Sequence, residues 1–99
     1  MASSICVSGL RDTMPTISRF LGITIRIYYE DHGVPHFHAY YGESEATVAI
    51  DTLEVLAGSL PPRVTALILE WASQRRQGLR ADWQRAQAHL PLRNLEPLE

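Results

Sequence analysis

Apolar and more polar side chains alternate along residues 23–30 of this chain. Ile23, Ile25, Ile27 and Tyr29 occupy the odd positions, and Thr24, Arg26, Tyr28 and Glu30 lie between them. A period of two is typical of a β-strand, because successive side chains of a strand point to opposite faces of the sheet. The segment therefore predicts a strand with its isoleucine face on a hydrophobic core.

Similar short segments follow, separated by turn residues. They predict strands over 36–41, 46–50 and 53–57, and Ile17–Phe20 is a candidate for a further short strand. The links 31–35, 42–44 and 51–52 are rich in Gly, Pro, Asp and Ser, which are typical of turns. Links this short favour antiparallel neighbours over crossover connections.

The period changes after Pro61-Pro62. Val64, Leu67, Ile68 and Trp71 follow the i, i+3, i+4, i+7 spacing of an amphipathic helix. Gly78 is predicted to interrupt it, and Leu79, Trp83, Ala86 and Leu90 indicate a second helix that Pro91 ends. Residues 92–98 predict an extended tail along the sheet. The fold class is α+β: an antiparallel β-meander of about four strands, followed by two α-helices packed on one sheet face.

The first thirteen residues show no sustained period. We expect a flexible N-terminal extension over 1–13, upstream of a natural start at Met14, and a single α+β domain over 14–99. An edge strand around Ile5–Val7 is the alternative for the extension. Cys6 is the only cysteine, which excludes an intrachain disulfide and favours a reducing, cytoplasmic location. The N-terminus lacks the basic start and apolar middle of a secretion signal, and no apolar run approaches the ~20 residues that span a bilayer.

The charge balance argues against a general nucleic-acid binder. All nine basic residues are arginine, and the formal net charge is −2. Proteins that bind nucleic acid usually carry a basic face and a high pI. RNA is therefore expected as a partner only under the enzyme alternative described below.

Two histidines two residues apart form the best candidate site. His36 and His38 lie in Pro35-His36-Phe37-His38-Ala39, inside a predicted strand. Side chains at i and i+2 of a strand leave the same face, roughly 6.6 Å apart. The two imidazoles are therefore expected to point together, away from the core that takes Phe37 and Ala39.

Three kinds of chemistry fit this pair. In the first, no cofactor is bound and the histidine face is a protein interface, since Tyr, His and Arg are common interface residues. In the second, His36 and His38 bind zinc or another divalent transition metal, with Glu30, or alternatively Asp31 or His32, as the third ligand.

The third kind is catalysis without a metal. His36 and His38 would serve as general base and general acid, with Arg26 and Tyr28 from the preceding strand beside them. Cleavage of RNA needs a base, an acid and a cation for the developing charge. This alternative is a ribonuclease-type toxin, and whether the chain is an enzyme stays open.

Several motifs together resemble one bacterial family. They are Met14–Phe20, Tyr28–His32, Pro35–Ala39, Tyr41-Gly42 and Gly58–Arg63. The chain resembles domain-of-unknown-function family 4160 over 14–98. The resemblance marks His36 and His38 as part of the family's motif, with no role assigned to either.

The resemblance also implies a partner. Members of that family are often encoded beside small proteins of another uncharacterised family, number 2442, in a toxin–antitoxin-like arrangement. By this analogy the chain is a small cytoplasmic protein-interaction domain, one component of a two-gene pair, which binds the product of the adjacent gene. A homo-oligomer is an open alternative, and no membrane is involved.

Overall fold

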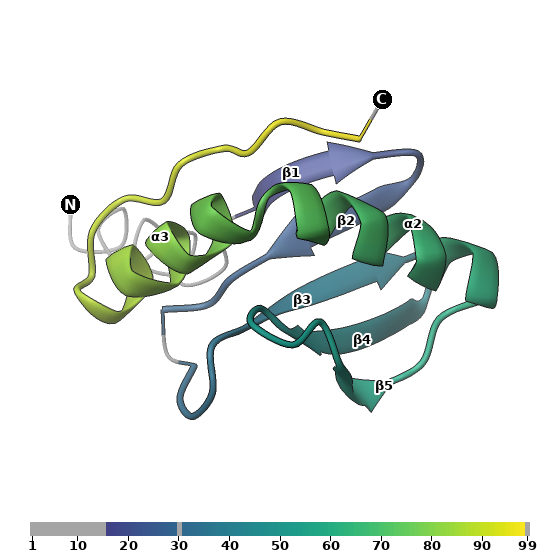
Figure 1. The fold of residues 1–99 in the computed structure, drawn as a ribbon, viewed down its shortest axis with the longest axis horizontal. Helices are drawn as coiled ribbons and strands as arrows, with labels where there is room; N and C mark the ends of the chain where they lie inside the picture. The colour runs from purple at the N-terminus through teal and green to yellow at the C-terminus, as the bar shows by residue number, and fades with distance from the viewer. Residues whose placement is uncertain (1–15, 30, 99) are drawn as a thin grey trace, which may run out of the picture.

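The computed structural model describes residues 16–29 and 31–98 of the chain. Its strands are β1 (Thr16–Phe20), β2 (Ile23–Arg26), β3 (His36–Tyr41), β4 (Ser44–Ala49) and β5 (Val55–Gly58). Two helices follow, α2 (Pro62–Gln74) and α3 (Arg76–Gln87). The strands pair antiparallel in the order β1-β2-β3-β4-β5, and both helices lie on one side of the sheet (Figure 1). The predicted α+β meander is confirmed.

The strand boundaries differ from the prediction in several places. β2 ends at Arg26, although the alternation predicted a strand over 23–30, and β4 covers Ser44–Ala49 where 46–50 was predicted. The sheet has five strands because β1, named only as a candidate, pairs with β2. The fourth predicted strand begins later, at Val55, because Leu53 takes a left-handed turn conformation with φ 61° and bonds back to the carbonyl of Ala49. The predicted extension over 1–13 lies outside the described residues.

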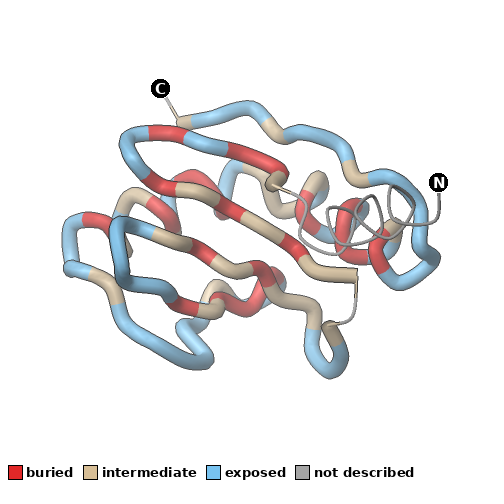
Figure 2. The backbone as a smooth tube through the Cα atoms, turned by 180° about the vertical axis from the view of Figure 1, so that it is seen from behind, coloured by how far each residue is buried: buried red, intermediate tan, exposed pale blue. Residues whose placement is uncertain are grey.

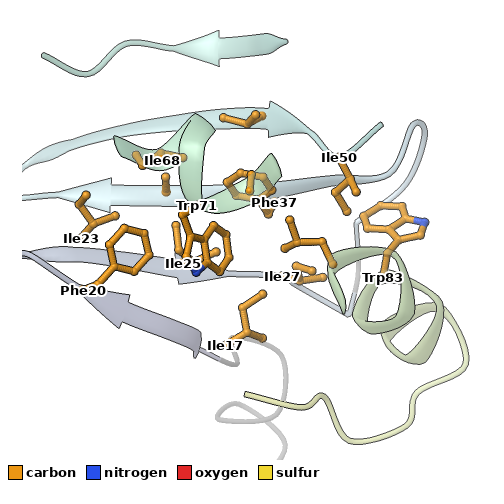
Figure 3. Packing of buried hydrophobic residues seen from close by; sticks show 14 of the residues in the cluster. Ile17, Phe20, Ile23, Ile25, Ile27, Phe37, Ile50, Ile68, Trp71 and Trp83 are labelled. Carbon is orange, nitrogen blue, oxygen red and sulfur yellow. The ribbon is translucent and has the colours of Figure 1, made fainter. Parts of the chain in front are cut away.

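The core lies between the sheet and the helices. Ile23, Ile25 and Ile27 are at most 1% exposed, as the alternation predicts. Trp71 of α2 is fully buried and packs against the rings of Phe20 and Phe37, with centroids 5.4 and 5.9 Å away (Figure 3). Seen from behind, buried residues alternate with partly exposed ones along the strands (Figure 2). One sheet face therefore supports the core, and the other carries the more polar side chains.

The helices are separated at Arg75, three residues before the predicted break at Gly78. Gly78 lies inside α3, where an added Cβ would come within 2.8 Å of the Leu95 side chain. Its role is thus to let the C-terminal tail approach the helix. The prediction failed here because a glycine that ends a helix and one that admits a neighbour look alike in the sequence.

The C-terminal tail runs back past β1, as predicted (Figure 1). The Leu95 N–H donates to the Ile17 carbonyl at 2.7 Å, and the Trp71 indole N–H donates to the Glu96 carbonyl at 2.8 Å. Arg75 donates to the same Glu96 carbonyl at 3.0 Å. The tail is therefore fastened to both layers of the domain. Within the described residues, neither helix is long and apolar enough to cross a membrane.

Asp82 of α3 is a charged group inside this packing. Its side chain is 1% exposed, and one carboxylate oxygen accepts a hydrogen bond from the Arg93 backbone N–H at 2.9 Å. The other oxygen has no hydrogen-bond partner among the described residues. Burial raises the pKa of Asp82 above its ordinary value, although the Arg93 hydrogen bond and the charges of Arg85 and Arg93 oppose the shift.

This raised pKa predicts a specific pH dependence of stability. The folded protein holds the Asp82 proton more tightly than the unfolded chain, so the contribution of this group is favourable below the ordinary pKa. That contribution is lost as the pH rises through the raised pKa of the folded state. Asp82→Asn keeps an acceptor for Arg93 and carries no charge. We expect the stability of Asp82→Asn relative to wild type to increase from about pH 3 to about pH 7 in denaturant titrations. A stability difference that does not change with pH would contradict this.

Candidate metal centre

His36 and His38 point to the same side of β3. Their ring centroids are 5.1 Å apart, whereas Phe37 and Ala39 between and beside them are fully buried on the helix side. His38 lies directly opposite Arg26 of β2 and Thr47 of β4. The geometry predicted for two imidazoles at i and i+2 of a strand is confirmed.

Asp31 joins the two histidines from the loop before β3. Its Oδ2 lies 3.2 Å from His36 Nε2 and 2.9 Å from His38 Nε2. The side chains are 20% exposed for Asp31, 12% for His36 and 15% for His38. Gln87, the last residue of α3, donates its side-chain N–H to the Asp31 carbonyl at 2.9 Å. The helix thereby holds the loop over the strand.

The outer nitrogens of both rings have partners of their own. His36 Nδ1 lies 2.8 Å from the Val34 carbonyl oxygen, which only accepts hydrogen bonds, so Nδ1 carries a proton. His38 Nδ1 lies 3.4 Å from Thr47 Oγ1. In a neutral His36 the lone pair is therefore on Nε2 and faces the Asp31 carboxylate. Two acceptors that face each other need a shared proton or a cation between them.

Aromatic side chains surround the site. The ring of Trp83 lies 5.0 Å from that of His36, and the ring of Tyr28 lies edge-on to His38 at 4.7 Å. The Tyr28 and Tyr40 hydroxyls are hydrogen-bonded to each other. Burial, followed by the bond to Tyr28, raises the pKa of Tyr40 well above its ordinary value. Tyr40 therefore stays uncharged at neutral pH.

Arg26 lies beside the Tyr40 ring. Its guanidinium carbon is 5.4 Å from the centre of the Tyr40 ring, and its Nε donates to Thr16 Oγ1 at 3.1 Å. The residues that the sequence grouped on this face, namely Arg26, Tyr28, His36 and His38, thus do share it.

Comparison with known proteins identifies the family. Residues 22–84 match the model of a domain of unknown function, DUF4160. The chain belongs to the DUF4160 family. The match confirms the resemblance, but it covers 22–84 and omits the ends of the predicted range 14–98. No curated protein and no solved structure matches the chain.

The matched part of this DUF4160 domain contains all three residues of the cluster. Among the described residues, Asp31, His36 and His38 are the group whose ligand atoms converge, within 4.8 Å of one another. Asp31 was one of the alternatives for a third ligand. Glu30, the preferred one, lies outside the described residues, and His32 is exposed and is not part of the cluster.

Sequence reasoning missed three contacts of this candidate site. Thr47, Trp83 and Gln87 touch His38, His36 and the Asp31 backbone, respectively. Thr47 had a usable signal, because a tight hairpin at 42–43 places it opposite His38. Trp83 and Gln87 had none, because the position of α3 over the loop is set by tertiary packing.

Proposed function

We propose that this domain binds a divalent transition metal ion, with zinc as the first candidate, through Asp31, His36 and His38. The observation that carries the proposal is the convergence of the two Nε2 atoms on one carboxylate oxygen while each Nδ1 is engaged elsewhere. Histidines that bind metals commonly donate the other ring N–H to a carbonyl or similar group, which fixes the tautomer. His36 has this arrangement through Val34, and Thr47 supplies an oxygen for His38.

The distances from the Asp31 carboxylate oxygen to the two ring nitrogens suit a small cation, and all three ligand atoms lie within 4.8 Å of one another. Metal–nitrogen bonds of ~2.0–2.1 Å at tetrahedral angles place neighbouring ligand atoms ~3.3 Å apart. The carboxylate oxygen lies 3.2 and 2.9 Å from the two nitrogens. One carboxylate and two neutral imidazoles would supply three ligands and leave a fourth position for water or another ligand, as in zinc sites that act on substrates. Imidazole and carboxylate ligands also suit ferrous iron.

The test is a zinc titration of the full chain, purified without a histidine tag. We expect one equivalent to bind, and a free zinc concentration near 100 times Kd to stabilise the fold by about 2.7 kcal/mol. For a domain of this size that corresponds to a rise in Tm of roughly 10–20 °C. His38→Ala and Asp31→Asn should each remove most of this shift, because each deletes one of three ligands.

His32→Ala is the matched control, because His32 is in the same loop but exposed and outside the cluster. It should retain the full zinc shift. An unchanged Tm of the wild type with saturating zinc, cobalt, nickel and ferrous iron would sink the proposal. The contacts of Asp31 with the two rings would then only hold the loop against β3.

The ribonuclease-type alternative is less directly supported. General acid–base catalysis needs a ring nitrogen that reaches the substrate. Both Nε2 atoms face Asp31, and His36 Nδ1 is bonded to Val34. Catalysis by His36, His38, Arg26 and Tyr28 would therefore require these contacts to open.

Protein association is the second candidate function. In this function the chain is one component of a cytoplasmic toxin–antitoxin-like pair. Its partner would be a family 2442-like protein encoded by the adjacent gene, a choice that rests on the family resemblance alone. The observation that favours association is the outer edge of β5. All four residues of β5 are exposed, and β5 is the last strand in the sheet order.

A further inference from the structure

The outer edge of β5 combines exposed backbone with exposed apolar side chains. Val55 and Leu56 are 39% and 45% exposed, and among the described strands β5 pairs only with β4. An unpaired edge strand presents N–H and C=O groups that another chain can bind by adding a strand. A bulge at Thr47/Val48 shortens the regular pairing of β5 with β4, and no strand of residues 16–29 or 31–98 pairs with the outer side of β5.

A hollow lies on each face of the sheet at this edge. One has a volume of about 170 Å³ and is lined by Val55 together with Thr65 and Ile68 of α2, so it lies on the helix side. The other, about 240 Å³, is lined by Leu56 together with Pro35 and Ala49. Ala49 lies opposite His36, which places this second hollow on the side away from the helices.

These two hollows match the geometry of an added strand. Successive side chains of an extended segment point to opposite faces. A segment paired with β5 would therefore place one side chain beside Val55 and α2, and the next beside Leu56. Both hollows offer apolar contacts, which supply specificity in addition to the backbone hydrogen bonds.

The charge around this edge indicates what kind of segment fits. No arginine occurs from residue 27 to residue 62, whereas Glu43, Glu45, Asp51 and Glu54 all lie in that range. Arg76 of α3 reaches this end of the sheet, where its Nε donates to the Ile50 carbonyl at 3.3 Å. Asp51 is paired with Arg80 at 2.6 Å, and Glu45 and Glu54 are exposed. Two copies pairing antiparallel through β5 would bring Glu54 of each toward the Gly58 end of the other. Glu45 lies at that end, so like charges oppose a second copy.

We infer that the outer edge of β5 binds an extended segment of a protein partner, in which apolar side chains alternate with arginine or lysine. The segment adds to the sheet as a sixth strand next to Val55–Gly58. This inference rests on the second candidate function, protein association, and is independent of the metal centre. It also places the interface on β5, whereas the sequence placed it on the histidine face.

The first experiment uses a synthetic peptide of alternating arginine and valine as the probe, with an alternating glutamate and valine peptide for comparison. Amide NMR shifts of the full chain should change along β5 and around the two hollows only with the basic peptide. The double variant Glu45→Lys and Glu54→Lys should weaken binding about tenfold, since each charge pair contributes a fraction of a kcal/mol to about 1 kcal/mol. Glu70→Lys, an exposed position on α2, is the matched control and should bind as the wild type does.

Equal binding of the acidic peptide, or shifts centred on His36 and His38, would overturn the inference. Concentration-dependent dimerisation that Leu56→Ser abolishes would also overturn it in favour of a second copy. Co-expression with the adjacent open reading frame tests two claims separately. One is that the chain associates with that gene product, and the other is that the β5 edge is the interface. A complex that protects β5 amides from hydrogen exchange supports both; a complex that protects another surface keeps association and removes the β5 edge. If no complex forms, association with that product is excluded. The peptide experiment alone then decides whether the β5 edge binds an extended segment.

Discussion

Replacing Trp71 by alanine is expected to lower the free energy of unfolding by about 3–5 kcal/mol. Trp71 is fully buried, its ring contacts Phe20 and Phe37, and its indole N–H bonds to the Glu96 carbonyl (Figure 3). The substitution leaves a cavity between α2 and the sheet and releases one attachment of the tail. Because native domains are stable by only ~5–15 kcal/mol, this loss is a large part of the total.

Urea titration followed by circular dichroism measures this loss directly. Trp71→Phe is the matched variant, because it keeps an aromatic ring in the core and removes the hydrogen bond to the tail. It should cost about 1–2 kcal/mol, since the bond itself contributes ~1 kcal/mol. A cost below about 2 kcal/mol for Trp71→Ala would mean that the helix layer does not depend on this side chain.

The same residues show why the fold was largely predictable. A half-buried sheet imposes a period of two and a covering helix imposes the i, i+3, i+4, i+7 spacing, so the isoleucines of β2 and Trp71 of α2 could be assigned from the sequence. Polar residues rarely interrupt these two patterns, because burying a polar side chain without hydrogen-bond partners lowers the stability of the fold. Turn residues then fixed the order of neighbours, since short links allow only antiparallel pairing.

Features set by contacts between distant segments were not predictable. The break between the helices falls at Arg75 because packing positions α3, and Gly78 serves the tail instead.

In the candidate site, too, local features were predictable and contacts between distant segments were not. The common direction of His36 and His38 follows from the strand alone. The choice of Asp31 among neighbouring carboxylates and histidines does not, because the path of the loop is set by Gln87 on α3 and by the Val34 carbonyl. The sequence therefore predicts His36 and His38 as two ligands of the candidate metal centre. It limits the third ligand to Glu30, Asp31 or His32 without choosing among them.

Replacing Gly58 by alanine is the second substitution expected to have a large effect. Gly58 has φ +75°, and an added Cβ would lie 2.3 Å from the Glu45 carbonyl oxygen and 3.0 Å from the Ala46 Cα. Both atoms belong to the backbone of β4, so neither can move without breaking the β4–β5 pairing. We expect a loss of about 2–5 kcal/mol, the sum of left-handed strain and overpacking.

Gly42→Ala separates these two causes. Gly42 has φ +60°, but an added Cβ meets nothing within 4 Å. It should cost only the conformational strain, about 1–2 kcal/mol, and the difference between the two variants then measures the clash with β4. Equal losses in urea titrations would show that β4 and β5 adjust to the extra carbon.

Gly58→Ala also distinguishes the two proposals. Gly58 pairs with Ala46, which lies opposite Ala39, whereas the metal centre depends on His36, His38 and Asp31. At temperatures where the variant stays folded, zinc affinity should therefore remain within about twofold of wild type, since distant sites act almost independently. Binding of the basic peptide should be lost, because a displaced β5 no longer offers a straight edge between its two hollows. Loss of zinc binding together with peptide binding would mean that the histidine face and the β5 edge form one coupled surface.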